Sequence, residues 1–110
     1  MKNYIQPGET IEVTAPAALS SGDGVLVGSI FGIAQTDAAN GAAVQIARRG
    51  VFTHAKTSAQ AWTQGAKIYW DDTGKVFTTT ATANTLVGVA VLAAANPSAT
   101  GTVLLDGAVR

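Results

Sequence analysis

Gly, Pro, Asn and Asp residues divide this sequence into short apolar stretches, and this division most limits how the chain can fold. Residues 9–14 alternate apolar and polar side chains, as expected of a strand with one buried face. Residues 66–70 and 75–79 are aromatic and β-branched, and they flank a turn at residues 71–74. This arrangement predicts a hairpin. No apolar periodicity of the helical kind runs long enough to predict a helix of useful length.

The rest of the chain has the same character. Gly28 and Gly32 predict a tight connection or a bulge between two strands. Residues 57–64 are ambiguous and could form one helical turn that ends at Gly65, although eight residues rarely hold a helix alone. Further strands are expected at residues 25–27, 43–47, 51–54, 86–92 and 102–105. About seven or eight short strands predict an all-β fold, a small barrel or a sandwich, with at most one short helical turn.

The length and the low charge limit the organisation and the surface of the protein. A chain of 110 residues fits one domain, and we expect an N-terminal arm (residues 1–8) followed by a single β domain (residues 9–110). Only 13% of the residues are charged, against about 25% in typical soluble domains. Uncharged polar side chains such as threonine must therefore cover the outside, or a partner must cover part of it.

The charge balance argues against two classes of partner. Seven basic and seven acidic side chains offer no electrostatic footprint for nucleic acid or for an anionic membrane. Arg48 and Arg49 form the only basic cluster, and neighbours in a strand point to opposite faces. The longest apolar run, residues 89–95, is too short to span a membrane, and residues 1–13 lack an apolar stretch of signal-peptide length. We expect the chain to be made and kept in a cytoplasm, or in a particle assembled there.

Residues with chemical function are sparse. The chain has no cysteine, so disulfides, thiolate metal ligands and cysteine nucleophiles are excluded. His54 is the only histidine and lacks an evident orienting carboxylate, so we expect it on the surface or at a rim. Asp71 and Asp72 are adjacent in a turn, which favours a structural role over weak metal binding. No glycine-rich segment carries the lysine of a phosphate-binding loop. The sequence predicts no catalytic residue, no metal site and no cofactor.

Aromatic residues leave one alternative function open. Trp62, Tyr69 and Trp70 could form a platform that binds carbohydrate if the two tryptophans were exposed and coplanar. However, Tyr69 and Trp70 alternate across a predicted strand, so at most one of them faces any given surface. Aromatic residues make up only 6% of the chain, and a core this thin needs most of them. The core interpretation is therefore favoured.

Six segments, in order and spanning nearly the whole chain, resemble the capsid cement (decoration) family of tailed phages, formerly a domain of unknown function sometimes mislabelled as a recombinase. They read NYIQPGETIEVTAPA, SGDGVLVGSIFGIA, GVFTHAK, QGAKIYWDDTGKVFTTT, NTLVGVAVLAAA and TGTVLLDG. No single motif is chemically specific; their succession carries the resemblance. The resemblance implies a structural virion protein that binds the outer surface of the capsid shell and stabilises it. It implies the major capsid protein as partner, a homo-oligomer with a trimer favoured, assembly in the bacterial host cytoplasm, and no catalytic residues.

Two segments are candidates for contact with the capsid or with a neighbouring subunit. Tyr4 and Ile5 are apolar residues ahead of a Pro7–Gly8 turn and outside any clear strand, so Tyr4, Ile5, Gln6 and Pro7 are expected to form an arm that makes such contacts. The loop at Gly22 and Asp23 is a second candidate. Three alternatives are another head or tail component of a phage, a carbohydrate-binding or adhesin-type β module, and a small enzyme.

Overall fold

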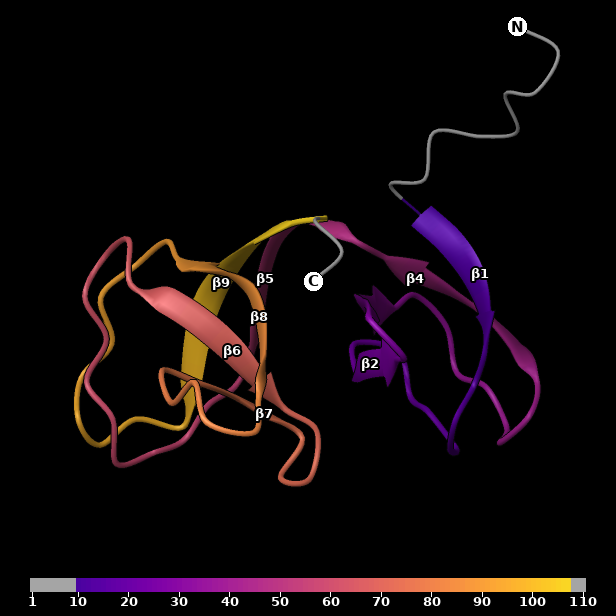
Figure 1. The fold of residues 1–110 in the computed structure, drawn as a ribbon, viewed down its shortest axis with the longest axis horizontal. Coiled ribbons are helices and arrows are strands. Elements are labelled where there is room, and N and C mark those ends of the chain that lie inside the picture. Colours follow the sequence, from indigo (N-terminus) through magenta and orange to yellow (C-terminus); the bar gives the residue numbers. More distant parts are fainter. Residues whose placement is uncertain (1–9, 108–110) are drawn as a thin grey trace, which may run out of the picture.

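The computed structural model describes residues 10–107, and within these residues it contains nine strands and no helix. The strands form two antiparallel sheets, which lie beside each other in Figure 1. The first sheet has the order β1-β4-β3-β2 and the second the order β5-β9-β8-β6-β7. The strands are β1 (Thr10–Thr14), β2 (Gly24–Val27), β3 (Ile30–Ala34), β4 (Ala43–Ala47), β5 (Arg49–Ala55), β6 (Lys67–Asp71), β7 (Val76–Thr78), β8 (Thr85–Ala90) and β9 (Thr100–Asp106).

One nearly continuous stretch of chain links the two sheets. β4 ends at Ala47 and β5 begins at Arg49, so only Arg48 separates a strand of the first sheet from a strand of the second. Figure 1 shows this crossing at the top of the molecule. β5 then pairs with β9 over its whole length, from Arg49 opposite Asp106 to Ala55 opposite Thr100. The guanidinium of Arg48 donates a hydrogen bond to the carbonyl oxygen of Gly107, which holds the crossing to the end of β9.

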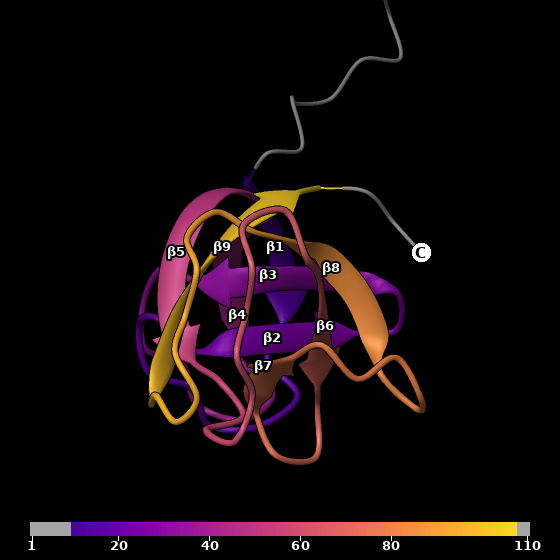
Figure 2. The same ribbon diagram turned by 90° about the vertical axis from the view of Figure 1, so that its left-hand side faces the viewer.

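The second sheet curls so far that the chain directly after its outer strand β5 contacts its other outer strand, β7. Lys56, directly after β5, forms a parallel bridge with Phe77 of β7, and the Thr57 N–H donates to the Phe77 carbonyl oxygen at 2.9 Å. The pairing of β6 with β8 shifts register between Ile68 and Tyr69, and such bulges increase strand twist. Figure 2, which faces this sheet, shows its strands running across those of the first sheet behind them. The second sheet is therefore a half-barrel.

Buried apolar side chains form two clusters. The larger one fills the half-barrel and includes Trp62, Trp70 and Phe77, each at most 2% exposed. It also takes in Ile33 of the first sheet, and Leu26 and Phe31 pack against it. The smaller cluster centres on Ile46, Val25 and Val44, with other members from the first sheet and the loops next to it. Because the larger cluster draws on both sheets, it joins them into one structure.

The predicted all-β class is confirmed, but there is one strand more than the predicted seven or eight. The additional strand is β3, whose Gly32 suggested an interruption between strands. In the structure Gly32 lies inside β3 because a Cβ atom there would be 2.8 Å from the Ala47 carbonyl oxygen and 3.0 Å from the Ile46 side chain. This glycine permits close approach of two strands and does not end one. Residues 57–64 form an irregular loop without a helical turn.

Candidate interaction surfaces

A pocket of about 200 Å³ lies between the two sheets. The loop after β1 (residues 16–19) and β2 line one side of it. His54 of β5, Trp70 of β6 and Lys75 of the β6–β7 turn line the other side. The lining is mainly apolar with charged groups at few positions, a composition that suits binding of a small apolar group.

Trp70 determines the shape of this pocket because its indole ring packs directly on the backbone of β2. A Cβ atom on Gly24 would lie 2.4 Å from the tip of the ring, so only glycine leaves room for it. The ring centroid is 5.0 Å from that of Phe31, 5.4 Å from that of Phe77 and 5.5 Å from that of His54. Tilted and edge-to-face contacts at these distances are favourable arrangements of aromatic rings. Trp70 thus connects both sheets at the pocket.

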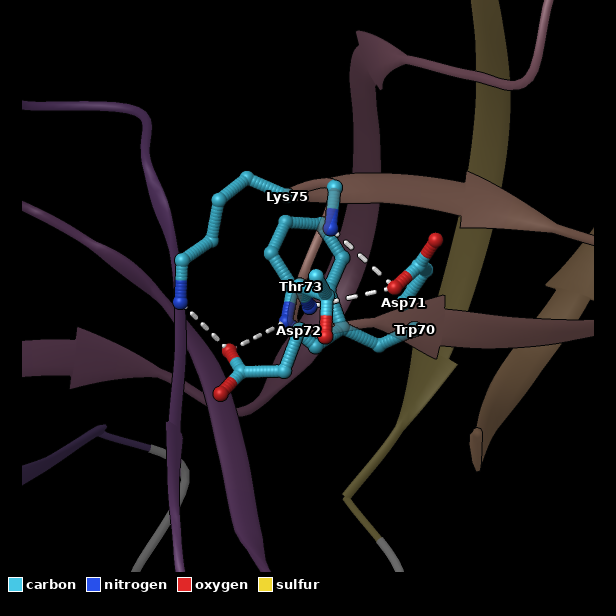
Figure 3. A network of polar contacts seen from close by, with 6 residues as sticks. Trp70, Asp71, Asp72, Thr73 and Lys75 are labelled. Carbon is cyan, nitrogen blue, oxygen red and sulfur yellow. Dashed lines mark hydrogen bonds and ion pairs between the residues drawn. The ribbon is translucent and has the colours of Figure 1, made fainter. Parts of the chain in front are cut away.

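Hydrogen bonds to the β6–β7 turn fix the orientation of Trp70 (Figure 3). The indole N–H donates to Oδ1 of Asp72 at 3.0 Å, and Nζ of Lys75 donates to the same oxygen at 2.7 Å. Lys75 has a φ angle of 57°, a left-handed conformation that turns the chain back into β7. Partial burial acts to raise the pKa of Asp72, but the hydrogen bonds from Lys75 and Trp70 and the charge of Lys75 outweigh it. The pKa of Asp72 therefore lies below its usual value.

We expect Asp72 to stabilise the fold at neutral pH and to lose this effect in acid. A carboxylate with a lowered pKa in the folded state stabilises the protein above its unfolded pKa, and this stabilisation is lost as pH falls through the folded pKa. Urea unfolding of the D72N variant between pH 7 and pH 3 should show a shallower loss of stability on acidification than the wild type. At neutral pH the difference should stay within about 1 kcal/mol, because Asp72 and Lys75 are both exposed. Identical pH profiles for the two proteins would contradict this prediction.

Gly22 and Asp23, which the sequence suggested as contact residues, form a tight turn ahead of β2. Gly22 has a φ angle of 94°, and its N–H donates to the Ala34 carbonyl oxygen at 2.8 Å. Oδ2 of Asp23 accepts the Ser20 N–H at 2.9 Å, and the Asp23 carbonyl oxygen accepts the Ala34 N–H at 2.8 Å. These bonds hold the turn to the end of β3. Asp23 also lines the pocket between the sheets, so a partner in that pocket would meet it.

The arm residues Tyr4, Ile5, Gln6 and Pro7 lie outside the described residues. His54 lies at a rim as expected, since it is half-buried and lines the pocket between the sheets. The turn role of Asp71 is confirmed, because its Oδ1 accepts the N–H groups of Thr73 at 3.1 Å and Gly74 at 3.1 Å. The partners of Asp72 in Trp70 and Lys75 did not follow from the sequence pattern.

The positions of the tryptophans argue against a carbohydrate platform. Trp62 is 2% exposed and Trp70 is 1% exposed, so neither ring is available to stack on a sugar. Trp62 packs beneath Gly101, where a Cβ atom would be 2.1 Å from the ring. The ammonium of Lys56 lies 5.5 Å from the centre of the Trp62 ring, and it donates to the carbonyl oxygens of Thr57 and Gln60. These aromatic residues therefore belong to the core.

The outer face of the half-barrel carries an exposed apolar row that was not predicted from the sequence. Val51 of β5 and Leu104 of β9 lie opposite each other and are 57% and 40% exposed. Leu104 is also opposite the half-buried Val89 of β8. The row formed by Val51, Leu104 and Val89 crosses three neighbouring strands. The period-two pattern of residues 49–55 could have indicated that Val51 is exposed, because Val51 alternates with Phe52, which packs against the larger cluster. A contiguous exposed apolar patch indicates an interaction surface.

Neither a metal site nor a membrane-spanning helix occurs within residues 10–107. No group of three or more His, Cys, Asp or Glu side chains there is placed to hold a metal ion. No helix in this part of the chain is long and apolar enough to cross a bilayer. Side-chain hydrogen bonds close the protein's own turns and loops, as at Asp23, Asp71 and Gln60.

These features define a small all-β protein whose candidate contact residues lie on its surface and in its turns. A family model described as phage cement protein matches residues 5–105. The chain belongs to the phage cement protein family. Membership gives it a structural, capsid-associated role in a phage particle, and such a family is not enzymatic in general. No curated protein matches the sequence.

Proposed function

We propose that this protein binds the outer surface of an assembled phage capsid shell and stabilises the shell. Family membership across residues 5–105 is the observation that carries the proposal. The partner is the major capsid protein, and the site of action is the outside of the virion after assembly in the host cytoplasm. We further propose that the protein acts as a homo-oligomer, with a trimer favoured, and that it uses neither nucleic acid nor a membrane.

The proposed mechanism is linkage by mass action. A protein that binds the mature shell, but not its loosened form, stabilises the shell by its binding free energy. Many copies on a symmetric lattice act together, so each contact can be modest. No catalytic group is needed for this function, and the proposed contribution of each copy depends only on the surface it presents.

Two surfaces support binding to a protein shell. The row of Val51, Leu104 and Val89 is apolar, with Val51 and Leu104 exposed and Val89 half-buried. Burying its exposed part against a partner is favourable by roughly 25 cal/mol per Å². The turn at Gly22 and Asp23, next to the pocket between the sheets, is the second surface. The arm at residues 1–8, with Tyr4, Ile5, Gln6 and Pro7, remains a proposed contact with the capsid or with a neighbouring copy.

The test is co-sedimentation of the purified protein with expanded, undecorated capsids of its phage. We expect saturable binding at a fixed ratio to the shell protein, together with a higher temperature of shell disruption once the sites are filled. The V51S/L104S double variant should bind at least tenfold more weakly, because it makes the exposed row polar without altering buried side chains. The matched control is T53S/T102S, which changes the neighbouring cross-strand pair of the same two strands.

Protein that stays in the supernatant at micromolar concentration would reject the proposal. Equal binding by V51S/L104S and the wild type would reject the apolar row as the contact surface, while leaving shell binding itself intact.

Deletion of residues 2–6 should also weaken association with the capsid while the isolated fold persists. Unchanged association of the deletion variant would reject the arm.

A further inference from the structure

The outer strand β1 differs from the other outer strands of the two sheets. Outer strands expose unpaired backbone groups, and proteins protect them by cover, closure, twist or charge. β2 has only four residues, which limits what its edge can bind, and the ring of Trp70 packs on its face at Gly24. β7 is joined to the chain after β5 by the bridge at Phe77, so the two outer strands of the second sheet approach each other there. β1 has five regular pairs with β4, from Thr10 opposite Ala47 to Thr14 opposite Ala43. Within residues 10–107 its edge is neither covered nor closed, and its one charged residue is Glu12.

The hydrogen-bonding direction of β1 follows from the residue after it. The Ala15 N–H donates to the Ala42 carbonyl oxygen at 2.8 Å, and the Ala15 carbonyl oxygen accepts the Gly41 N–H at 2.9 Å. Because backbone groups alternate in direction along a strand, the N–H and C=O groups of Ile11 and Val13 also point toward β4. The N–H and C=O groups of Thr10, Glu12 and Thr14 therefore point away from the sheet, where an added strand would bind them.

The side chains of β1 define what an added strand must carry. Ile11 and Val13 pack against the smaller core cluster but remain half-exposed, so an apolar residue beside them would complete their burial. Thr10, Glu12 and Thr14 are exposed on the opposite face. A second β1 strand paired about its centre would put two Glu12 carboxylates opposite each other, which is unfavourable. A complementary strand has an apolar residue facing the core and a cation on the outer face.

The first residues of this chain have that pattern. In Lys2-Asn3-Tyr4-Ile5-Gln6, alternation puts Ile5 and Asn3 on one face and Lys2, Tyr4 and Gln6 on the other. With Tyr4 opposite Glu12, Ile5 would lie beside Ile11 or Val13, depending on strand direction. Lys2 would then be a diagonal neighbour of Glu12, close enough for charge attraction.

Residues 2–6 fit poorly as a strand beside β1 of their own chain. A hairpin with Pro7–Gly8 as a two-residue turn would pair Tyr4 with Ile11, which places Ile5 on the outer face. A one-residue change of register exchanges the two faces of a strand. A three-residue loop would restore the pattern but would require a left-handed conformation at Glu9, where glycine is preferred. Another copy can supply the segment in either direction without these constraints.

We propose that residues 2–6 of one copy add as a strand to the free edge of β1 in a neighbouring copy. Each copy then offers one segment and one edge, so the contact is head-to-tail and closes into a ring when the rotation between copies allows. This self-association does not depend on shell binding, and it is tested on the purified protein without capsids.

The experiment measures mass by light scattering for the wild type, for the full-length E12P variant and for a variant lacking residues 2–6. Proline at position 12 removes an outward N–H that β4 does not use, a position where edge strands tolerate proline. The E12P variant keeps residues 2–6, but its β1 edge has lost the outward N–H of position 12. The deletion variant keeps the complete β1 edge but lacks residues 2–6. We expect an oligomeric wild type, two monomeric variants, and a heterodimer but nothing larger when the variants are mixed. The control E12T keeps the outward N–H and should remain oligomeric.

Three outcomes would overturn the proposal. A monomeric wild type would show that the segment binds its own edge or no copy of the chain. An oligomeric deletion variant would place the interface elsewhere. Two monomeric variants that stay monomeric after mixing would show that segment and edge do not bind each other. Circular dichroism of E12P checks its fold, and the deletion variant tests the segment without altering any residue of β1.

Discussion

The W70A variant is expected to lose about 3–5 kcal/mol of unfolding free energy, the usual cost of removing a buried tryptophan. Trp70 is 1% exposed and packs on Phe31, Phe77 and His54 as well as on the backbone of Gly24. Its loss leaves a cavity where the two sheets meet. The measurement is urea unfolding followed by circular dichroism. The control Y69A lies on the same strand, but its half-buried side chain points to the other face, so it should cost clearly less.

A double-mutant cycle tests whether the contact between Trp70 and Gly24 holds the sheets together. The G24A variant forces a methyl group to within 2.4 Å of the ring, and such overpacking costs about 1–3 kcal/mol. In a W70L background, the same G24A change should cost much less, because the shorter side chain leaves room for the methyl group. Equal costs in the two backgrounds would show that the ring does not press on β2. A W70A variant as stable as the wild type would contradict the central role of Trp70.

The G88A variant is expected to lose at least about 3 kcal/mol of unfolding free energy, at or beyond the upper end of typical overpacking costs. Gly88 lies in β8, where a Cβ atom would be 2.0 Å from the carbonyl oxygen of Leu104 in β9. The obstacle is backbone inside a paired sheet, so it cannot move aside as a flexible side chain could. The measurement is thermal and urea unfolding of the purified variant.

The control for G88A is G74A, in the exposed β6–β7 turn. A Cβ atom at Gly74 would be 3.0 Å from Oδ2 of Asp71, a side-chain atom that can shift, so we expect a cost within about 1 kcal/mol. If G88A is as stable as G74A, the close pairing of β8 with β9 at this position is wrong.

Much of the local structure was predictable because it depends on neighbouring residues. Alternation of apolar and polar side chains in residues 9–14, and the aromatic arms around residues 71–74, predicted β1 and the β6–β7 hairpin. Both depend only on the period of a strand and on the preference of Asp and Gly for turns. The predicted turn role of Asp71 is confirmed for the same reason, since its hydrogen bonds reach only two and three residues along the chain.

The glycines show where local reasoning fails. Gly32 looked like an interruption between strands, and Gly88 lay inside the predicted strand at residues 86–92 with no sign of a special role. Both lie within strands at points where a second strand passes too close for a side chain. Gly24 is required by a ring 46 residues further along the chain, that of Trp70. No pattern of nearby residues reports such contacts. Their prediction would need the strand order and register.

The sequence by itself determined the all-β class, most strand positions, and the absence of cysteine chemistry from the whole chain, because these depend on residue type and on local spacing. Tertiary structure decided which surfaces are available. It buried both tryptophans, which removed the carbohydrate platform, and it exposed Val51 beside Leu104 on one face. It also left β1 at an open edge. Burial and edges depend on which strands pair, and pairing is set by contacts between residues far apart in the chain.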